Sequence, residues 1–402
     1  MLDFPDPPTP RSAHRIAELD ILRGFALFGI LISNAVFAVA QWAPDRADSP
    51  SDRLIVATVE ALLSARFYPL FAFLFGYAFT LQVRAATRAG ASPAARSVRR
   101  CAALMAVGLV HVLFLWDGDI LTLYAALGLI LIAVRALGPR SAALAGTALA
   151  LIGAMGSVVP ALSFGDGLEM PDVGAAYTGS AAETFTAQIA LAPTSLLLVW
   201  SAGAVPTLAM FLLGMAAGKL NLLEQSRAAR TRALYVLAVG LGAGLPVSAL
   251  TFAATMRWWT PPSALAGIQA LVNPLMTFAY LAAVLLAARS VRLGRPCAVL
   301  APAGTTAASN YIGQSIVLMV VYTGYGFALA DDVSLAAVIA IGVLTFAAQL
   351  ALSARWRSGH PYGPVEWFLR AATYSTVPAW RLRESADGLP RAVELRSPAV
   401  ET

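Results

Sequence analysis

The chain alternates long apolar stretches with short polar connections, and most of the apolar stretches are about 20 residues long. A helix of about 20 residues crosses the ~30 Å hydrocarbon core of a bilayer and satisfies its own backbone hydrogen bonds there. The pattern therefore predicts ten transmembrane helices, at residues 21–40, 66–83, 101–116, 119–134, 141–163, 195–217, 233–254, 264–288, 298–328 and 333–354.

Composition supports the same fold class. Of the 402 residues, 58% are hydrophobic and only 12% are charged, whereas soluble domains carry about 25% charged residues. We expect an all-α polytopic membrane protein with one transmembrane domain at 19–384, made of an N-terminal half (19–225) and a C-terminal half (226–384). The Pro-rich start (1–18) and the end (385–402) are expected to be disordered cytoplasmic tails.

The basic residues indicate how the chain is oriented. Counted against the ten spans, all but four of the 28 basic residues fall on one side, and the exceptions are Arg46, Arg53, Arg66 and Arg257. The positive-inside rule then places both termini in the cytoplasm. The net charge of +6 is dispersed between spans rather than gathered on one face, so we expect no nucleic-acid partner. Cys101 and Cys297 are expected to be reduced thiols.

Two segments allow a second interpretation. Ala38-Val-Ala40 resembles a signal-peptidase site, but acidic residues precede the first span and Ser33-Asn34 interrupt it, which favours a retained helix. Residues 52–64 mix charged and apolar positions, and this pattern is typical of an amphipathic helix that lies flat on the outer membrane surface.

A histidine inside a predicted span is the clearest candidate for chemistry. His111 is the only one of three histidines in a span, and an ionisable group there normally faces the bundle interior or a wet cavity. Asp117 and Asp119 follow in a short outer loop. A histidine and a carboxylate brought together can act as a base and its orienting partner. Alternatively, His111 bonds neighbouring helices and the aspartates are solvated. We expect no metal site, because the membrane interior offers no second His or Cys ligand.

The cytoplasmic end offers a candidate anion site. Asp20 and Arg23 are three residues apart on one helix face, and Gly24 next to them allows a close approach by a helix or ligand. Arg99 and Arg100 begin the third span on the same side, so they can add phosphate contacts. The simpler alternatives are a local ion pair at the membrane entrance and ordinary positive-inside charge.

Further polar residues complete the set of candidate substrate contacts. Asn310 and Gln314 lie four residues apart near mid-depth, and Asn34 is similarly placed in the first span. They either line a substrate path or bond helices together. Trp116 and Tyr124 flank the two aspartates. Glu366 belongs to Gly363-Pro-Val-Glu366-Trp367-Phe-Leu-Arg370, which fits an interfacial helix that closes the cytoplasmic face.

These motifs resemble those of the YeiB-like family of bacterial inner-membrane proteins, also called domain of unknown function 418. The similarity covers roughly residues 15–385, and its motifs are Leu19-Asp20-Ile-Leu-Arg23-Gly24, Phe67-Tyr-Pro-Leu-Phe-Ala-Phe-Leu-Phe-Gly76, Gly108-Leu-Val-His111, Trp116-Asp117-Gly-Asp119, Ser309-Asn310-Tyr311-Ile-Gly-Gln314-Ser315 and Gly363-Pro-Val-Glu366-Trp367.

The family is in turn similar to the transmembrane acyltransferases that include heparan-α-glucosaminide N-acetyltransferases. The resemblance implies acyl transfer from cytoplasmic acyl-CoA or acetyl-CoA to a sugar, lipid or small-molecule acceptor, in the bacterial inner membrane. A homodimer is compatible with the sequence. The lysosomal enzymes carry a reactive histidine in the first exterior loop, and residues 41–65 hold none. If the chemistry is shared, either His111 serves instead, oriented by Asp117 or Asp119, or a different group does the work.

Two other classes of function fit the same residues. A transporter or exporter of a small amphiphile would use His111 and Asp119 as a proton relay. A structural membrane protein would use the polar residues only to pack its helices. A tunnel from the cytoplasm to His111 would favour the enzyme.

Overall fold

The computed structural model describes residues 10–42, 49–157, 174–224, 226–262, 264–384 and 390–391. Within these ranges the fold is a bundle of helices, with one antiparallel pair of two-residue strands, β1 (Arg383–Glu384) and β2 (Pro390–Arg391). Seven candidate spans in the described part of the chain are long and apolar enough to cross a membrane. The chain is therefore a multi-pass helical membrane protein.

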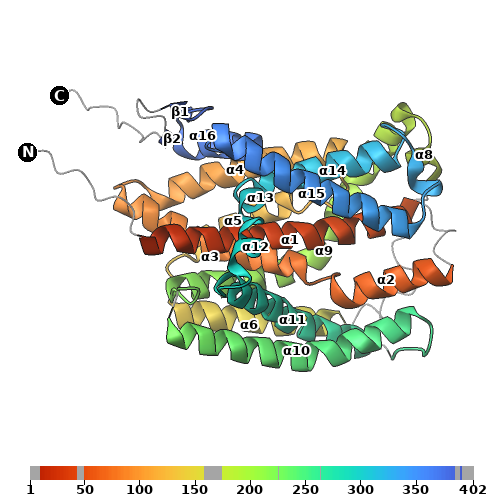
Figure 1. The fold of residues 1–402 in the computed structure, drawn as a ribbon, viewed down its shortest axis with the longest axis horizontal. Coiled ribbons are helices and arrows are strands. Elements are labelled where there is room, and N and C mark those ends of the chain that lie inside the picture. Colours follow the sequence, from red (N-terminus) through yellow and green to blue (C-terminus); the bar gives the residue numbers. More distant parts are fainter. Residues whose placement is uncertain are drawn as a thin grey trace, which may run out of the picture.

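Figure 1 shows the order of the helices along the chain. They are α1 (Pro10–Trp42), α2 (Pro50–Leu62), α3 (Phe67–Arg88), α4 (Pro93–Phe114), α5 (Leu121–Ala133), α6 (Pro139–Gly156), α8 (Gly174–Thr178), α9 (Ala181–Lys219), α10 (Arg227–Thr255), α11 (Ala264–Ala288), α12 (Gly294–Ala298), α13 (Ala301–Thr305), α14 (Ala307–Tyr322), the 3-10 helix η2 (Leu329–Asp331), α15 (Leu335–Gly359) and α16 (Pro364–Tyr374).

The predicted spans match helices, but several boundaries differ. The predicted continuous helix at 298–328 is wrong, because α12, α13 and α14 are separate helices. Thr306, with φ −114° and ψ 38°, breaks the helical conformation between α13 and α14. Pro296 and Pro302 provide no backbone donor in this region. Helix α1 begins at Pro10, inside the segment predicted to be a disordered tail, while residues 1–9, 158–163 and most of 385–402 lie outside the described ranges.

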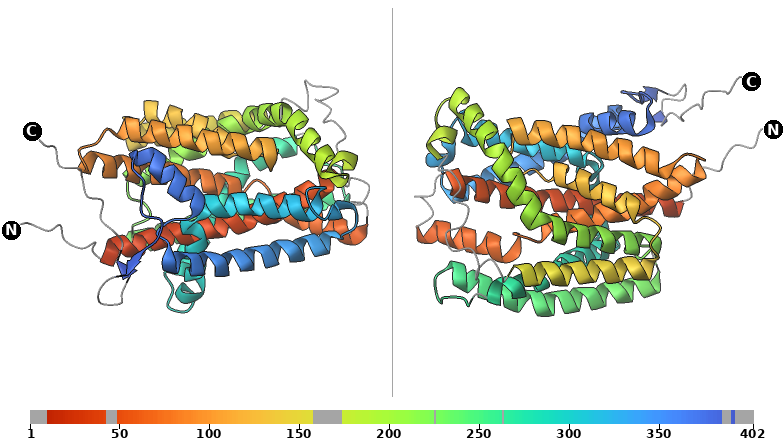
Figure 2. Two further views of the ribbon diagram at one scale, coloured as in Figure 1. Left: turned by 90° about the horizontal axis from the view of Figure 1, so that it is seen from above. Right: turned by 180° about the vertical axis from the view of Figure 1, so that it is seen from behind.

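The helices run largely along one axis, so the bundle has two ends (Figures 1 and 2). We call them the α16 end, where α1 begins and α16 lies, and the α8 end. The connections between α3 and α4 and between α9 and α10 lie at the α16 end, whereas α4 and α5 are joined at the α8 end. This alternation agrees with the predicted up-and-down order of the spans.

Helix α1 forms the centre of the bundle and contacts α3, α11, α13, α14 and α15. Small residues let the backbones approach closely, as in many membrane helix pairs. A Cβ on Gly24 would lie 2.3 Å from the carbonyl oxygen of Leu300, so the close approach predicted at Gly24 is confirmed. Helices α3 and α9 interlock in the same way, since a Cβ on Gly76 or on Gly214 would lie 2.1 Å from a carbonyl oxygen of the other helix.

Helix α2 differs from the expectation of a helix lying flat on the membrane surface. It runs along the bundle axis in Figure 1 and in the right-hand view of Figure 2, and it packs against α10, α1 and α15. The side chain of Arg66 explains part of this placement. It is 3% exposed, and its Nη1 donates to the carbonyl oxygens of Glu60, at 2.9 Å, and Ser64. Arg66 thus caps the C-terminal end of α2 and joins it to α3.

Candidate functional site

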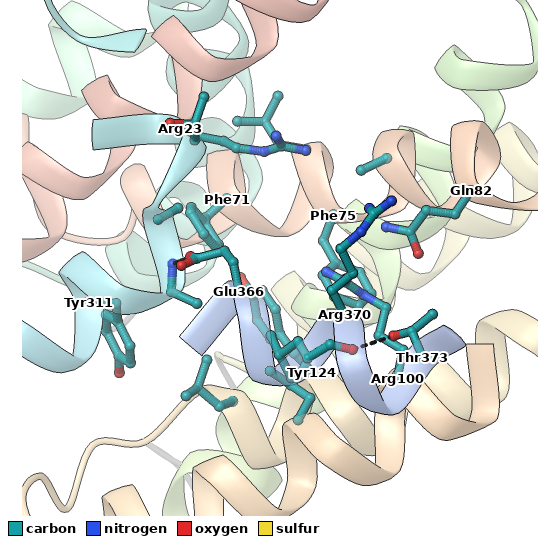
Figure 3. A pocket seen from close by; sticks show the side chains of 18 of the residues that line it. Arg23, Phe71, Phe75, Gln82, Arg100, Tyr124, Tyr311, Glu366, Arg370 and Thr373 are labelled. Carbon is teal, nitrogen blue, oxygen red and sulfur yellow. Dashed lines mark hydrogen bonds between the residues drawn. The ribbon is translucent and has the colours of Figure 1, made fainter. Parts of the chain in front are cut away.

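A cavity of about 400 Å³ lies at the α16 end of the bundle (Figure 3). Its walls come from α1, α3, α4, α5, α13, α14 and α16. The residues of its interior wall are apolar or aromatic: Leu27, Ile30, Phe71, Leu74, Phe75, Leu104, Leu121, Tyr124 and Tyr311. This size falls within the ~300–1,000 Å³ of small-molecule sites, and the apolar wall is typical of them.

Four arginines line the cavity: Arg23 on α1, Arg96 and Arg100 on α4, and Arg370 on α16. Figure 3 shows Arg23 and Arg370 on different sides of the cavity. Glu366 is the single acidic residue among those that line it. Four positive charges against one carboxylate favour an anionic ligand, and guanidinium groups match the geometry of phosphate oxygens.

The arginines are held in place by neighbouring groups. Arg23 Nη1 donates to Asp20 Oδ1 at 2.7 Å, so the predicted pair is confirmed, and the Arg23 side chain remains 28% exposed. The guanidinium of Arg370 lies 4.7 Å from the ring centre of Tyr362 and 4.6 Å from that of Tyr374. Cation–π contacts of this kind orient the guanidinium without neutralising its charge.

The adjacent arginines that begin the third predicted span diverge. Arg100 lines the cavity. Arg99 instead points to α16, where its Nε donates to the carbonyl oxygen of Thr373 at 3.1 Å. Arg96 and Arg100 are four residues apart and therefore share a helix face. This spacing in the sequence is the signal that pairs Arg96, rather than Arg99, with Arg100 at the cavity.

Glu366 binds the start of α14. One carboxylate oxygen accepts from the backbone N–H groups of Ala308, at 2.6 Å, and Ser309, at 3.2 Å, and the other accepts from Ser309 Oγ at 2.5 Å. Helix α14 has no side-chain cap of its own, so Glu366 supplies the cap from α16. Burial raises the pKa of Glu366. The contacts make Glu366 a clamp between the two helices at the cavity wall.

His111 lies between a carboxylate and a hydroxyl group. Its Nδ1 is 2.8 Å from Asp119 Oδ1, and its Nε2 is 2.8 Å from Ser315 Oγ. The three side chains come from α4, the loop before α5, and α14, and none is more than 2% exposed. Asp119 Oδ2 also accepts from the backbone N–H of Thr122 at 2.8 Å. The predicted pairing of His111 with an aspartate is thus present, through Asp119.

Asp117 does not contact His111. Its Oδ1 accepts from the backbone N–H of Gly118 at 3.0 Å, and burial raises its pKa. Asp117 is 6% exposed and Asp119 is fully buried, so the alternative with solvated aspartates is wrong. Trp116, beside them, packs edge-on against Trp42 with ring centres 5.9 Å apart.

Tyr311 stands between the His111 cluster and the cavity. It lines the cavity, its ring centre lies 5.1 Å from that of His111, and Ser315 follows one helical turn later on α14. On α4, Leu104 lines the cavity and His111 lies seven residues further on, about 10 Å along the axis. The cavity therefore ends next to the buried histidine, and Tyr124 lines it from α5.

The three predicted amides lie away from the cavity. Asn34 Oδ1 accepts from the Tyr68 hydroxyl, and Asn310 Nδ2 donates to Ser353 Oγ at 2.9 Å. Gln314 Nε2 donates to Gln349 Oε1 at 3.0 Å. None of the three amides is among the residues that line the cavity. Their contacts fit the alternative in which these side chains bond helices together.

Sequence reasoning missed four residues of this region: Ser315, Tyr311, Arg96 and Arg370. Ser315 and His111 are 204 positions apart, so no local spacing connects them. Arg370 was assigned only to the interfacial helix. Among the described residues, no group of three or more His, Cys, Asp and Glu side chains is placed to hold a metal ion.

Comparisons with known proteins agree with the motifs. Residues 217–376 match the family model described as "Protein of unknown function (DUF418)". The chain is 26% identical over 395 residues to the uncharacterized protein YxaH of Bacillus subtilis. This alignment covers 90% of this chain and 94% of that protein. It is also 26% identical over 384 residues to an uncharacterized 39.9 kDa protein of Bacillus acidopullulyticus, covering 93% and 98%.

A third relative is YeiB of Escherichia coli, an uncharacterized protein that is 32% identical over 124 residues, covering 29% of this chain and 30% of that protein. The names of these three relatives state no activity. Together with the match at residues 217–376, they confirm the resemblance drawn from the motifs: the C-terminal part of the chain matches the DUF418 family model, and the chain is similar to YeiB.

Proposed function

We propose that the protein is a membrane acyltransferase that takes an acyl group from an acyl-CoA at the α16 end and passes it to an acceptor near the buried His111. The single observation that carries this proposal is the position of His111. It is held by Asp119 directly behind the inner wall of a cavity lined by four arginines.

The cavity suits a donor with a charged head and a slender apolar arm. Arg23, Arg96, Arg100 and Arg370 supply positive charge for phosphates. The wall between them and Tyr311 is apolar and aromatic, which suits the pantetheine arm and the acyl chain. The thioester would lie deepest, near His111. The α16 end would then face the cytoplasm, where acyl-CoA is found, with ten spans and both termini inside.

The chemistry needs a proton acceptor where the acceptor group attacks. Asp119 Oδ2 accepts from the Thr122 N–H, and as a carboxylate Asp119 pairs through Oδ1 with the Nδ1–H tautomer of His111, which leaves Nε2 to accept a proton. The acceptor is a hydroxyl or amine of a sugar, lipid or small molecule. No step requires a metal or nucleic acid. The helices are surrounded by the lipid bilayer, and the proposed location is the bacterial inner membrane. A homodimer is compatible with this arrangement.

The test is turnover by the purified protein in lipid nanodiscs. Acetyl-CoA and a long-chain acyl-CoA are supplied with a hexosamine or with diacylglycerol, and both free CoA and acylated acceptor are quantified by mass spectrometry. The proposal predicts acceptor-dependent release of CoA from one donor. If both donors stay intact while a proton gradient drives uptake of an anionic amphiphile into proteoliposomes, the protein is a transporter and the acyltransferase proposal is wrong.

A further inference from the structure

We propose that Ser315 is the nucleophile of this site and that the acyl group passes through an ester on Ser315. The inference deepens the proposed acyl transfer and rests on it for the identity of the acyl donor. The observation is geometric: Ser315 Oγ, His111 and Asp119 form an unbroken line of two 2.8 Å contacts through the two nitrogens of one imidazole.

The hydrogen-bond directions follow from the number of acceptors. Asp119 Oδ2 accepts from Thr122 N, so Asp119 can act through Oδ1 as the acceptor for His111 Nδ1–H. Nε2 is then unprotonated and accepts the proton of the Ser315 hydroxyl. Ser315 also lies 3.4 Å from the carbonyl oxygen of Tyr311, one turn earlier. This contact is the longer of the two, so the hydroxyl hydrogen points to His111.

The backbone is shaped to bring these groups together. Gly108 on α4 faces the loop that carries Asp119, and a Cβ there would lie 2.7 Å from Thr122 N and 3.0 Å from Asp119 Oδ2. Glycine therefore permits the loop to reach His111. Ser315 comes from α14, whose first turn is fixed by Glu366. A serine on α14, a base on α4 and an orienting carboxylate in the loop before α5 satisfy the general requirement for an activated nucleophile.

The reaction balances with the donor and acceptor already named. Ser315 Oγ bonds to the thioester carbon as its proton moves to His111 Nε2. The C–S bond then breaks, and the CoA sulfur leaves with that proton. An acceptor hydroxyl or amine next attacks the Ser315 ester and gives its proton to Nε2. The C–Oγ bond breaks, and Ser315 regains the proton. No oxidant or reductant is involved.

The route for the acyl group passes Tyr311. Its ring lies between the cavity and His111. Because Ser315 is only 2% exposed, passage of the acyl group from the cavity to Ser315 requires the Tyr311 side chain to move.

A fluorophosphonate probe with an alkyl chain tests the nucleophile without needing the natural donor. The full-length protein in nanodiscs is treated with the probe, digested and analysed by mass spectrometry. We expect phosphonylation at Ser315 in the wild type, and at least ~10²-fold slower labelling in His111→Gln, since the base supplies a factor of this order. Ser353→Ala, which removes another buried serine of the same bundle, should label normally.

Acyl-CoA turnover, measured in parallel, separates this inference from the proposed function. A wild type that turns over acyl-CoA while Ser315→Ala keeps full activity and Ser315 stays unlabelled would overturn the ester intermediate and leave direct transfer. Labelling of Ser315 without turnover of any acyl-CoA would retain the nucleophile and overturn the donor. Ser315→Thr keeps a hydroxyl group, so partial labelling in that variant, against none in Ser315→Ala, supports the assignment.

Discussion

The carbonyl oxygen of Asp20 lies where a side chain on Gly304 would stand, since a Cβ at residue 304 would be only 1.8 Å from that oxygen. Four residues later on α1, Gly24 makes the reciprocal approach to Leu300. The backbones of α1 and of the α12–α13 segment are therefore in direct contact on both sides of Arg23. This contact fixes the position of one of the arginines that line the cavity.

A methyl group at residue 304 should break this contact. In Gly304→Ala the backbones must separate, and overpacking of this kind costs about 1–3 kcal/mol or more. We expect a lower melting temperature in detergent for Gly304→Ala. The matched control is Gly313→Ala on α14, where the new Cβ would lie 3.5 Å from Gln349 Nε2, an ordinary contact. Equal melting temperatures for the two variants would contradict the close packing at Asp20.

The Glu366 clamp should make stability depend on pH. Its folded-state pKa is raised above the ordinary value of 4.5, so the carboxyl group holds its proton more tightly in the folded protein. The resulting stability is fully present below pH 4.5 and is lost as pH rises through the folded-state pKa. Glu366→Gln lacks this component.

Melting temperatures of the wild type and of Glu366→Gln, measured from about pH 4 upward, give the difference in stability. The stability of the wild type relative to the variant should decline as pH rises. A relative stability that increases with pH would mean that the backbone N–H groups of Ala308 and Ser309 dominate over burial.

Arg100 should contribute directly to donor binding. Loss of one charge-assisted hydrogen bond costs ~1.5–3 kcal/mol, which corresponds to about 10–150-fold in Kd. Arg100→Gln should weaken CoA binding by that amount in calorimetry. Arg88→Gln removes the same charge from an exposed position at the end of α3 and should leave the affinity unchanged. If both substitutions weaken CoA binding equally, Arg100 contributes only to the overall positive charge and does not bind the donor directly.

Membrane orientation can be tested at the two ends of the bundle. In a background without Cys101 and Cys297, Ala91→Cys lies in the α3–α4 connection and Asp332→Cys lies between η2 and α15. An impermeant thiol reagent should label Cys at 332 in intact cells and Cys at 91 only after the membrane is opened. The reverse pattern would place the cavity outside the cytoplasm, away from acyl-CoA.

The pattern of apolar stretches was sufficient to predict the helical class, because a long apolar segment that crosses a bilayer must satisfy its own backbone hydrogen bonds, and a helix does so. It did not predict the break at Thr306, since the apolar pattern continues from α13 into α14, although α13 packs closely against α1. The pattern also placed α2 on the membrane surface, although Arg66, an apparently exterior charge, caps α2 within the bundle.

The site was only partly predictable for a related reason. The pair His111 and Asp119 lies within one short segment, so a sequence window contains both. Ser315 joins them only through the packing of α14 on α4, and no window spans that distance. Asp117 and Asp119 were equivalent in the sequence, and only the fold, with Asp119 directed at His111 and Asp117 turned to Gly118, distinguishes them.

Replacing His111 with two different side chains separates its role in catalysis from its role in packing. Gln at this position can still hydrogen-bond to Asp119 or Ser315, but it cannot accept a proton at neutral pH. Leu leaves the buried Asp119 without its imidazole partner, which is costly for a charged group. His111→Leu should therefore melt at a lower temperature, whereas His111→Gln should stay close to the wild type.

The most direct measurement is the rate of acyl-CoA-dependent acceptor acylation by wild type and His111→Gln in the same nanodiscs, with melting temperatures recorded for both. Loss of the general base should lower the rate ~10²–10⁴-fold in a protein that remains folded. A stable His111→Gln variant that acylates its acceptor at the wild-type rate would contradict general-base catalysis by His111.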